Sequence, residues 1–135
     1  MAYLIDTDII IYSLKGNTIV QNHFSLNETI PKAISVITYG ELLYGAKKSK
    51  NVEKNLAVVY RIKELFPIIE IGKAVMETFS AVKISIQNSG TPVDDMDLLI
   101  ASTAMTLNYT LVTNNEKHFK KIRGLKIENW SREEG

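Results

Sequence analysis

Three carboxylates stand within four residues at Asp94, Asp95 and Asp97, directly ahead of an apolar run whose pattern is typical of a helix. Acidic side chains are common in a first helical turn, because they meet unpaired N–H groups and the positive end of the helix dipole. Carboxylates are also the groups that bind hard divalent cations. The cluster therefore has two interpretations, a helix start with Asp94 as its N-cap or part of a metal site, and its own sequence does not choose between them.

Three further acidic residues carry the same ambiguity. Asp6 and Asp8 directly follow the apolar run at 2–5, where they could bind a ligand at the end of a strand or cap the short helix that follows. Glu41 ends the segment Thr38-Tyr39-Gly40-Glu41, whose spacing matches a capping box that opens a helix at Leu42. The spacing alone favours the capping role, although the same geometry would also hold the carboxylate at the edge of a sheet.

Short apolar runs alternate with helical patterns along the chain. Strands are predicted at 2–5, 33–37, 68–71, 110–113 and 125–128, and helices at 18–26, 42–46, 52–65, 73–90 and 98–107, with a short helix near Phe119 and a frayed polar tail after 128. Near-continuous apolar strands are typical of parallel sheets covered on both faces, and the crossovers are long enough for parallel connections. The sequence therefore predicts one α/β domain over residues 1–135, a three-layer α/β/α sandwich with a mostly parallel central sheet.

Composition narrows the chemistry. The chain has 135 residues, a net charge of +1, no cysteine and two histidines, His23 and His118. These counts exclude disulfides, thiolate zinc sites and cysteine nucleophiles, and they exclude a histidine-rich metal site. The sequence shows no signal peptide and no apolar span of about 18 residues, so a soluble, cytoplasmic protein without membrane contact is expected.

A net charge this close to zero means that any nucleic acid must be bound by local basic patches. Two groups of basic residues are candidates, although such residues more often form a solvated face. The candidates are Lys47, Lys48, Lys50, Lys54, Lys117, Lys120, Lys121 and Arg123.

In a parallel sheet, four polar positions would meet at the carboxyl edge of the strands. Asp6 ends the first strand, Glu41 opens the helix after the second, Asp97 opens the helix before the fourth, and Asn115 lies just past the fourth. Two carboxylates about 4 Å apart repel by roughly 4 kcal/mol at an effective dielectric constant of about 20, so such a cluster takes up protons or binds a cation. Oxygen ligands alone point to Mg²⁺ or Mn²⁺, which suits the hydrolysis of phosphodiester bonds.

Five segments match one known pattern, in order, along nearly the whole chain: Leu4-Ile5-Asp6-Thr7-Asp8, Ser35-Val36-Ile37-Thr38-Tyr39-Gly40-Glu41-Leu42-Leu43-Tyr44-Gly45-Ala46, Asp97-Leu98-Leu99-Ile100-Ala101, Leu111-Val112-Thr113-Asn114-Asn115 and Leu125-Lys126-Ile127-Glu128-Asn129-Trp130. Together they resemble a PIN-domain ribonuclease, and the closest group is the VapC toxins of bacterial and archaeal toxin–antitoxin pairs. The resemblance implies a metal-dependent endoribonuclease that cuts RNA and is silenced by a small cognate VapB-like antitoxin. It also implies a homodimer, buried through the apolar faces of the helices near 46–66.

The same resemblance implies roles for individual residues. Asp6, Glu41 and Asp97 match the family's acidic metal-site positions, and with Asn115 they form the expected catalytic set. The family often has an aspartate where this chain has Asn115, and an amide can ligate a metal or position a water but adds no charge. Three further carboxylates are expected to support the ligands, cap the helix and line the rim: Asp8, Asp94 and Asp95.

Three other functions are compatible with parts of the pattern. Asp6-Thr7-Asp8 after a strand resembles the nucleophile motif of haloacid-dehalogenase-like phosphatases, with Asp94-Asp95 as their metal pair, but that interpretation leaves Glu41 unused. A phosphoacceptor receiver domain would use Asp6 and Asp8 as its metal pair, but the third predicted strand ends without an acceptor aspartate. The third alternative is a PIN-like domain that binds RNA or an antitoxin without cutting.

Overall fold

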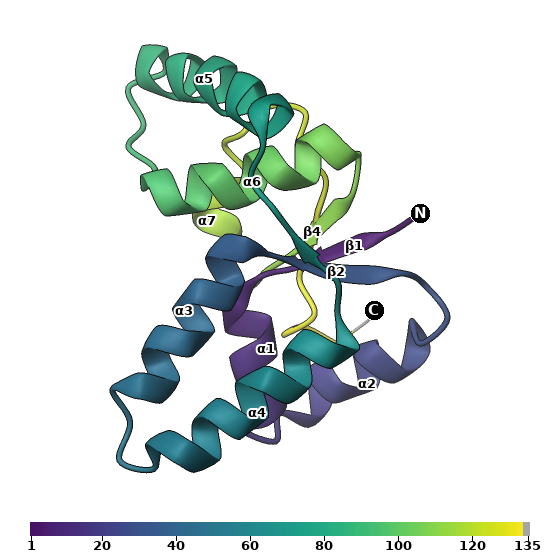
Figure 1. Ribbon diagram of the computed structural model, residues 1–135. Helices are drawn as coiled ribbons and strands as arrows, with labels where there is room; N and C mark the ends of the chain where they lie inside the picture. Colours follow the sequence, from purple (N-terminus) through teal and green to yellow (C-terminus); the bar gives the residue numbers. More distant parts are fainter. Residues whose placement is uncertain (134–135) are drawn as a thin grey trace.

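A sheet of five parallel strands, in the order β3-β2-β1-β4-β5, forms the centre of the computed structural model, which describes residues 1–133 (Figure 1). The strands are β1 (Tyr3–Ile5), β2 (Lys32–Ser35), β3 (Ile68–Ile69), β4 (Thr110–Val112) and β5 (Ile127–Glu128). β1 is central, and Tyr3 pairs with Lys32 of β2 on one side and with Thr110 of β4 on the other. The parallel sheet predicted from the apolar runs is confirmed.

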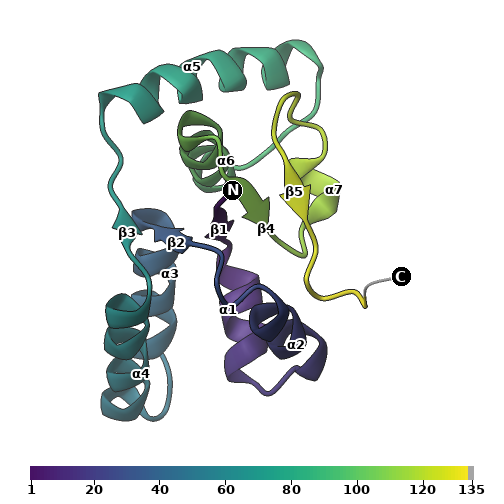
Figure 2. The ribbon, with the colours of Figure 1, turned by 90° about the vertical axis from the view of Figure 1, so that its right-hand side faces the viewer.

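Helices cover both faces of this sheet, which gives the three predicted layers (Figure 2). One face carries α1 (Thr7–Leu14), α2 (Thr18–Leu26), α3 (Val36–Lys47) and α4 (Val52–Leu65), and the other carries α5 (Lys73–Asn88), α6 (Asp95–Leu107) and α7 (Glu116–Phe119). α3 and α4 pack as a hairpin that extends away from the sheet (Figure 1). Within residues 1–133, every helix lacks the combination of length and apolarity that crossing a membrane requires.

Alternation along β1 divides the apolar residues between two cores. Tyr3 and Ile5 point into the core beneath α1 to α4, whereas Leu4 points into the core beneath α5 to α7. Successive side chains of a strand face opposite sides of the sheet, and all three residues are at most 3% exposed. Burial on both faces explains why the strand reads as an uninterrupted apolar run.

The start of α3 differs from the predicted start of this helix, and the difference changes the role of Glu41. α3 begins at Val36 rather than at Leu42, because Ser35 is its N-cap and the Ser35 hydroxyl accepts a hydrogen bond from the Thr38 N–H at 3.0 Å. The capping box assigned to Thr38 and Glu41 is therefore wrong. The β-branched residues at 36 and 37 fit a strand or a buried helix start equally well, and the serine before them decides for the helix.

The tail after β5 is ordered over residues 129–133 and not frayed as predicted, which is a second correction. Trp130 is 1% exposed and packs edge-on against Tyr3 and Phe24, with ring centroids 5.0 Å apart in both pairs. One buried aromatic ring anchors an otherwise polar segment, so composition alone underestimated its order. Residues 134 and 135 of the predicted tail lie outside the described part of the chain.

Candidate active site

Asp6 lies at the carboxyl end of β1 and caps α1. Its Oδ1 accepts a hydrogen bond from the Thr7 N–H at 2.8 Å, and its Oδ2 accepts one from the Thr113 hydroxyl at 2.8 Å. The side chain is buried, and burial raises the pKa of Asp6 to about 7, with nearby Asp8 and Asp97 adding to the rise and the two hydrogen bonds opposing it. Asp6 is therefore both a helix cap and a carboxylate that is costly to charge.

Asp8, in the first turn of α1, belongs to the same charged cluster. Its Oδ2 accepts a hydrogen bond from the Asn114 N–H at 3.1 Å, which ties α1 to the segment after β4. Its Oδ1 is buried and has no hydrogen-bond partner within residues 1–133. Burial raises the pKa of Asp8, and Asp97 raises it further. An ionised oxygen without a partner favours a cation or a proton beside it.

Asp97 brings a third carboxylate from α6. Its Oδ2 lies 3.6 Å from His118 Nδ1, and burial raises its pKa while the contact with His118 opposes the rise. Asp94 occupies the N-cap position as predicted, but its side chain accepts no hydrogen bond from the first turn in the described structure. Asp95 points away to an ion pair with Lys83, at 3.1 Å. Of the three neighbouring aspartates, Asp97 is the one linked to the cluster by contact with His118.

Glu41 is exposed on the second turn of α3 and reaches the site through a threonine. The Thr7 hydroxyl donates a hydrogen bond to Glu41 Oε1 at 2.6 Å and lies 3.1 Å from the Thr38 hydroxyl. Because the Thr7 N–H also binds Asp6, one residue at the start of α1 connects the two carboxylates. Glu41 therefore sits at the edge where it was expected, but as a mid-helix residue rather than a cap.

Asn115 and His118 complete the edge from the segment after β4. Asn115 Nδ2 lies 3.0 Å from His118 Nδ1, and the Asn115 N–H donates to the Thr113 hydroxyl, which itself binds Asp6. His118 was not among the predicted site residues, because the number of histidines in a chain does not indicate where in the fold they lie. Its position three residues after Asn115, in a segment that starts a helix, is the signal that could have identified it.

The C-terminal tail holds this segment in place. Asn129 Nδ2 donates to Asn114 Oδ1 at 3.2 Å and to Glu116 Oε2 at 2.9 Å. The Ser131 hydroxyl donates to Asn114 Oδ1 at 2.6 Å, and Arg132 pairs with Glu116 at 2.6 Å. Both residues that flank Asn115 are therefore fixed by the tail, a supporting role that sequence patterns gave no reason to expect.

The cluster fits a hard divalent cation by its donor chemistry and charge. Asp6, Asp8 and Asp97 are all oxygen donors, all three have raised pKa values, and one buried oxygen of Asp8 lacks a hydrogen-bond partner among the residues that the structure describes. Among the described residues, no three acidic or histidine side chains stand close enough to form a finished coordination shell. The carboxylates share one edge of the sheet without being arranged as a preformed metal cage.

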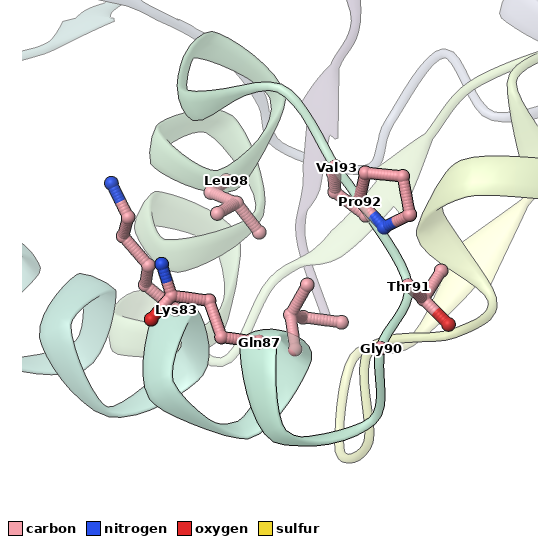
Figure 3. Close-up of a pocket in the computed structure, with 8 residues that line it drawn as sticks. Lys83, Gln87, Gly90, Thr91, Pro92, Val93 and Leu98 are labelled. Atoms are coloured by element: carbon pink, nitrogen blue, oxygen red, sulfur yellow. The ribbon is translucent and has the colours of Figure 1, made fainter.

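A cavity of about 410 Å³ lies between the end of α5, the loop that follows it and the first turn of α6 (Figure 3). It is mostly apolar and contains none of the acidic site residues. Its lining comes from the end of α5, the following loop and Leu98: Lys83, Ile86, Gln87, Gly90, Thr91, Pro92, Val93 and Leu98.

Comparison with known proteins gives a consistent result. The family model of the PIN domain matches residues 3–125. "Ribonuclease VapC2" of Rickettsia felis is 37% identical over 136 residues, which covers 98% of this chain and 100% of the relative. "tRNA(fMet)-specific endonuclease VapC" of Shigella flexneri is 32% identical over 132 residues, covering 97% and 99%.

Solved structures agree with the sequence comparisons. VapBC2 from Rickettsia felis, bound to a DNA fragment from its promoter, superposes with a TM-score of 0.90 and 35% identity, covering 96% of this chain and 99% of that one. DNA-bound VapBC from Salmonella typhimurium gives a TM-score of 0.89 and 32% identity, covering 96% and 98%. The likeness extends over the whole domain.

Proposed function

This chain belongs to the PIN domain family, and from that premise we propose that it is a VapC-type endoribonuclease, the toxin of a type II toxin–antitoxin pair. The observation that carries the proposal is the gathering of Asp6, Asp97 and Glu41 at the carboxyl edge of a sheet with this family's topology. Burial raises the pKa values of Asp6 and Asp97, and such shifted carboxylates are typical of functional sites.

We propose that Asp6, Glu41 and Asp97 hold one divalent cation, Mg²⁺ or Mn²⁺. When bound, such a cation lowers the pKa of a water and neutralises charge on the departing oxygen of a phosphodiester. The chain's own residues orient the ligands: Thr113 and the Thr7 N–H fix Asp6, and the Thr7 hydroxyl fixes Glu41. These hydrogen bonds leave the carboxylates little rotational freedom, which favours a fixed position for the reacting phosphate.

Asn115 and His118 are proposed to position groups rather than to supply charge. The amide of Asn115 contacts His118, and His118 contacts Asp97, so the segment after β4 and the start of α6 are held together. In this arrangement the amide occupies the edge without adding to the repulsion among the carboxylates. Asp8, whose buried Oδ1 has no hydrogen-bond partner among residues 1–133, is proposed to support the ligands.

The proposed partners are RNA, a VapB-like antitoxin and a second copy of the chain. The solved relatives are VapBC complexes, which supports an antitoxin as the partner. The Shigella flexneri relative is named for tRNA(fMet), so initiator tRNA is the first substrate to test. Phosphodiester contacts are assigned to the lysine groups at 47–54 and 117–123. We propose that the protein acts in the cytoplasm.

The test combines cleavage with metal-dependent stability. Asp97→Asn is expected to abolish cleavage of initiator tRNA in Mg²⁺ or Mn²⁺, whereas Asp95→Asn, in the same turn but paired with Lys83, is expected to retain it. Thermal unfolding without RNA gives a second readout. Metal should stabilise the wild type by about 2.7 kcal/mol at a hundredfold excess over the dissociation constant, and Asp97→Asn much less.

Three results would count against this proposal. If neither metal changed the stability of the wild type, the proposed cation site would be ruled out. Cleavage by Asp97→Asn at the wild-type rate would remove Asp97 from it. Metal binding without cleavage of any RNA would favour the non-catalytic PIN-like alternative. The PIN-domain assignment rules out the phosphatase and receiver-domain alternatives, because both belong to other families.

A further inference from the structure

The outer face of α3, defined as Gly40, Glu41, Tyr44, Lys47 and Lys48, is exposed along its whole length. The spacing of these residues places them on one side of the helix, since positions three, four, seven and eight residues apart share a face. The opposite side packs into the core, with buried residues Thr38, Leu42 and Ala46. α3 therefore presents one continuous polar and aromatic strip to solvent.

This strip starts at the proposed active site. Glu41 Oε1 accepts the hydrogen bond from Thr7 that links it to Asp6. Tyr44 is about 4.5 Å further along the helix axis at about 1.5 Å per residue, and Lys48 about 6 Å beyond it. The helix runs outward from the sheet edge along the α3–α4 hairpin (Figure 1). A ligand leaving the acidic site in this direction would meet the ring first and the lysines next.

Tyr44 has the exposure and surroundings of a stacking residue. It is 66% exposed, and Lys48 Nζ lies 4.9 Å from its ring centroid. Lys47 lies on the same strip, and Lys50 follows at the tip of the hairpin. Exposed aromatic rings flanked by cations bind single-stranded nucleic acids, because the ring stacks on a base while the cations contact phosphates.

Two glycines in α3 are consistent with a ligand that approaches the helix backbone closely. In the described part of the chain, a Cβ at Gly40 or at Gly45 would meet no atom within 4 Å beyond its chain neighbours and the adjacent helix backbone, so packing does not require glycine at either position. Neither residue has a positive φ, so backbone conformation does not require it either. Glycine is less favourable than alanine inside a helix. Its presence on the exposed strip, at Gly40, is explained if a ligand backbone passes directly over the helix.

We infer that the outer face of α3 binds a single-stranded segment of RNA beside the bond that is cut, with Tyr44 stacking on one base. This inference rests on the proposed function and deepens it. The segment is single-stranded because a paired base would not offer its face to the ring. A second copy of this chain fits the strip less well, since the expected dimer contact uses the apolar faces of the helices near 46–66, whereas the strip is polar and aromatic.

The chain offers a matched control at Tyr60. Tyr60 is 46% exposed and has Lys63 Nζ 5.5 Å from its ring centroid, so it repeats the pairing of Tyr44 with Lys48. It lies on α4, which contributes no residue to the acidic site. Affinity is measured by fluorescence anisotropy of a short labelled single-stranded RNA, using the full chain in EDTA so that cleavage does not interfere.

Tyr44→Ala is expected to weaken RNA binding by at least about fivefold, the lower limit for loss of one stacked base. Tyr44→Phe keeps the ring and should bind within about twofold of wild type, and Tyr60→Ala should bind as wild type does. Gly40→Ala should raise the melting temperature while weakening RNA binding. Damage to the fold would lower both the melting temperature and RNA affinity, so a rise in one with a fall in the other has a different cause.

Equal effects of Tyr44→Ala and Tyr60→Ala would overturn the inference, as would a Tyr44→Ala protein that binds RNA normally. A change of oligomeric state in Tyr44→Ala, measured by sedimentation, would identify the strip as a contact between copies and overturn it too. Loss of antitoxin binding with RNA binding unchanged would assign the strip to the antitoxin instead. Failure of the proposed function is separate: it appears as RNA that is bound through Tyr44 but never cut in metal.

Discussion

At the scale of single residues, the raised pKa of Asp6 explains how the carboxylates can lie close together before a cation binds. Burial and two neighbouring carboxylates raise the pKa of Asp6 to about 7, so near neutral pH the side chain is about half protonated without metal. A divalent cation would displace that proton, and metal affinity would rise as the pH rises through 7. The hydrogen bonds from Thr113 and Thr7 hold the carboxylate in one orientation in either state.

The raised pKa of Asp6 predicts how stability depends on pH. A carboxyl whose folded pKa exceeds the unfolded value of 3.8 binds more protons when folded, so its stabilising effect is full below about pH 4 and is lost as the pH rises through 7. Between these values the wild type in EDTA should lose stability with a slope of up to about 1.4 kcal/mol per pH unit from this group. Urea unfolding at several pH values from 4 to 8 measures the slope.

Asp6→Asn provides the comparison, because its amide does not titrate. The slope between pH 4 and 7 should become shallower in this variant but should not vanish, since burial also raises the pKa values of Asp8 and Asp97. Identical slopes in the two proteins would mean that Asp6 is ionised in the metal-free protein. The two variants must be compared in EDTA, because bound metal would mask the titration.

Glu41 offers a test that separates charge from hydrogen bonding. In Glu41→Gln the amide oxygen can still accept from the Thr7 hydroxyl, and the residue is exposed, so stability should stay within about 0.5 kcal/mol of wild type. Removing the charge should nevertheless lower RNA cleavage at limiting metal by at least about tenfold. Cleavage rates measured across a metal titration give the result, with exposed Glu53→Gln as the control. Normal activity at every metal concentration would remove Glu41 from the site.

At the scale of elements, the agreement between sequence and structure follows the strength of the local signals. The helices at 18–26 and 52–65 begin and end where the pattern predicted, because Asn17 caps the first and Phe66-Pro67 ends the second. The start of α3 was predicted too late in the sequence. Ser35 follows an apolar run and fits the end of a strand, whereas in the structure its hydroxyl caps the helix. Trp130 makes the tail ordered through contacts more than a hundred residues away in sequence, which no local pattern reports.

The tail yields a prediction at this scale. Asn129→Ala removes the hydrogen bonds to Asn114 and Glu116, the residues on either side of Asn115. Catalysis should fall by about 10- to 100-fold, as for other losses of groups that hold a site's ligands. The melting temperature should change little, because Trp130 keeps the tail attached. Cleavage kinetics and amide hydrogen exchange at Asn114 and Asn115 measure the two effects.

The control for the tail is Asn88→Ala, an exposed change at the end of α5. It should leave both cleavage and exchange as in the wild type. If Asn129→Ala cut RNA at the wild-type rate while exchange at Asn115 increased, the tail would stabilise the segment without affecting the reaction. If neither quantity changed, the hydrogen bonds of Asn129 would contribute nothing measurable to the site.

At the scale of the whole molecule, strand order is what assembles the site. β2, β1 and β4 are neighbours and parallel, so the ends of all three open on one edge, and α6 begins at that edge. The parallel arrangement was predicted from the alternation of strands and helices. It implied that Asp6, Glu41 and Asp97 lie at the same edge of the sheet. The contact of His118 with Asp97 and the support from the tail depend on side-chain packing, which alternation does not encode.

The low net charge of the chain predicts which residues contact the RNA phosphates. The whole chain carries only +1, so a general positive field cannot draw RNA to the protein, and local lysines must make the phosphate contacts. Each single-strand phosphate contact contributes about 0.7 to the slope of log affinity against log salt. Reversing Lys47 and Lys48 together to glutamate should therefore flatten that slope by about 1.4 if each lysine holds one phosphate.

A second pair separates local contacts from overall charge. Lys63→Glu with Lys73→Glu changes the net charge by the same amount, but these exposed lysines lie outside the outer face of α3. RNA affinity measured by anisotropy across a salt series should show the wild-type slope for this control pair and the flatter slope for the 47/48 pair. Equal flattening by both pairs would mean that RNA responds to overall charge, and the lysines of α3 would then be ordinary solvated residues. A difference confined to the 47/48 pair would place the phosphate contacts on the helix that also carries Glu41, and so beside the bond that is cut.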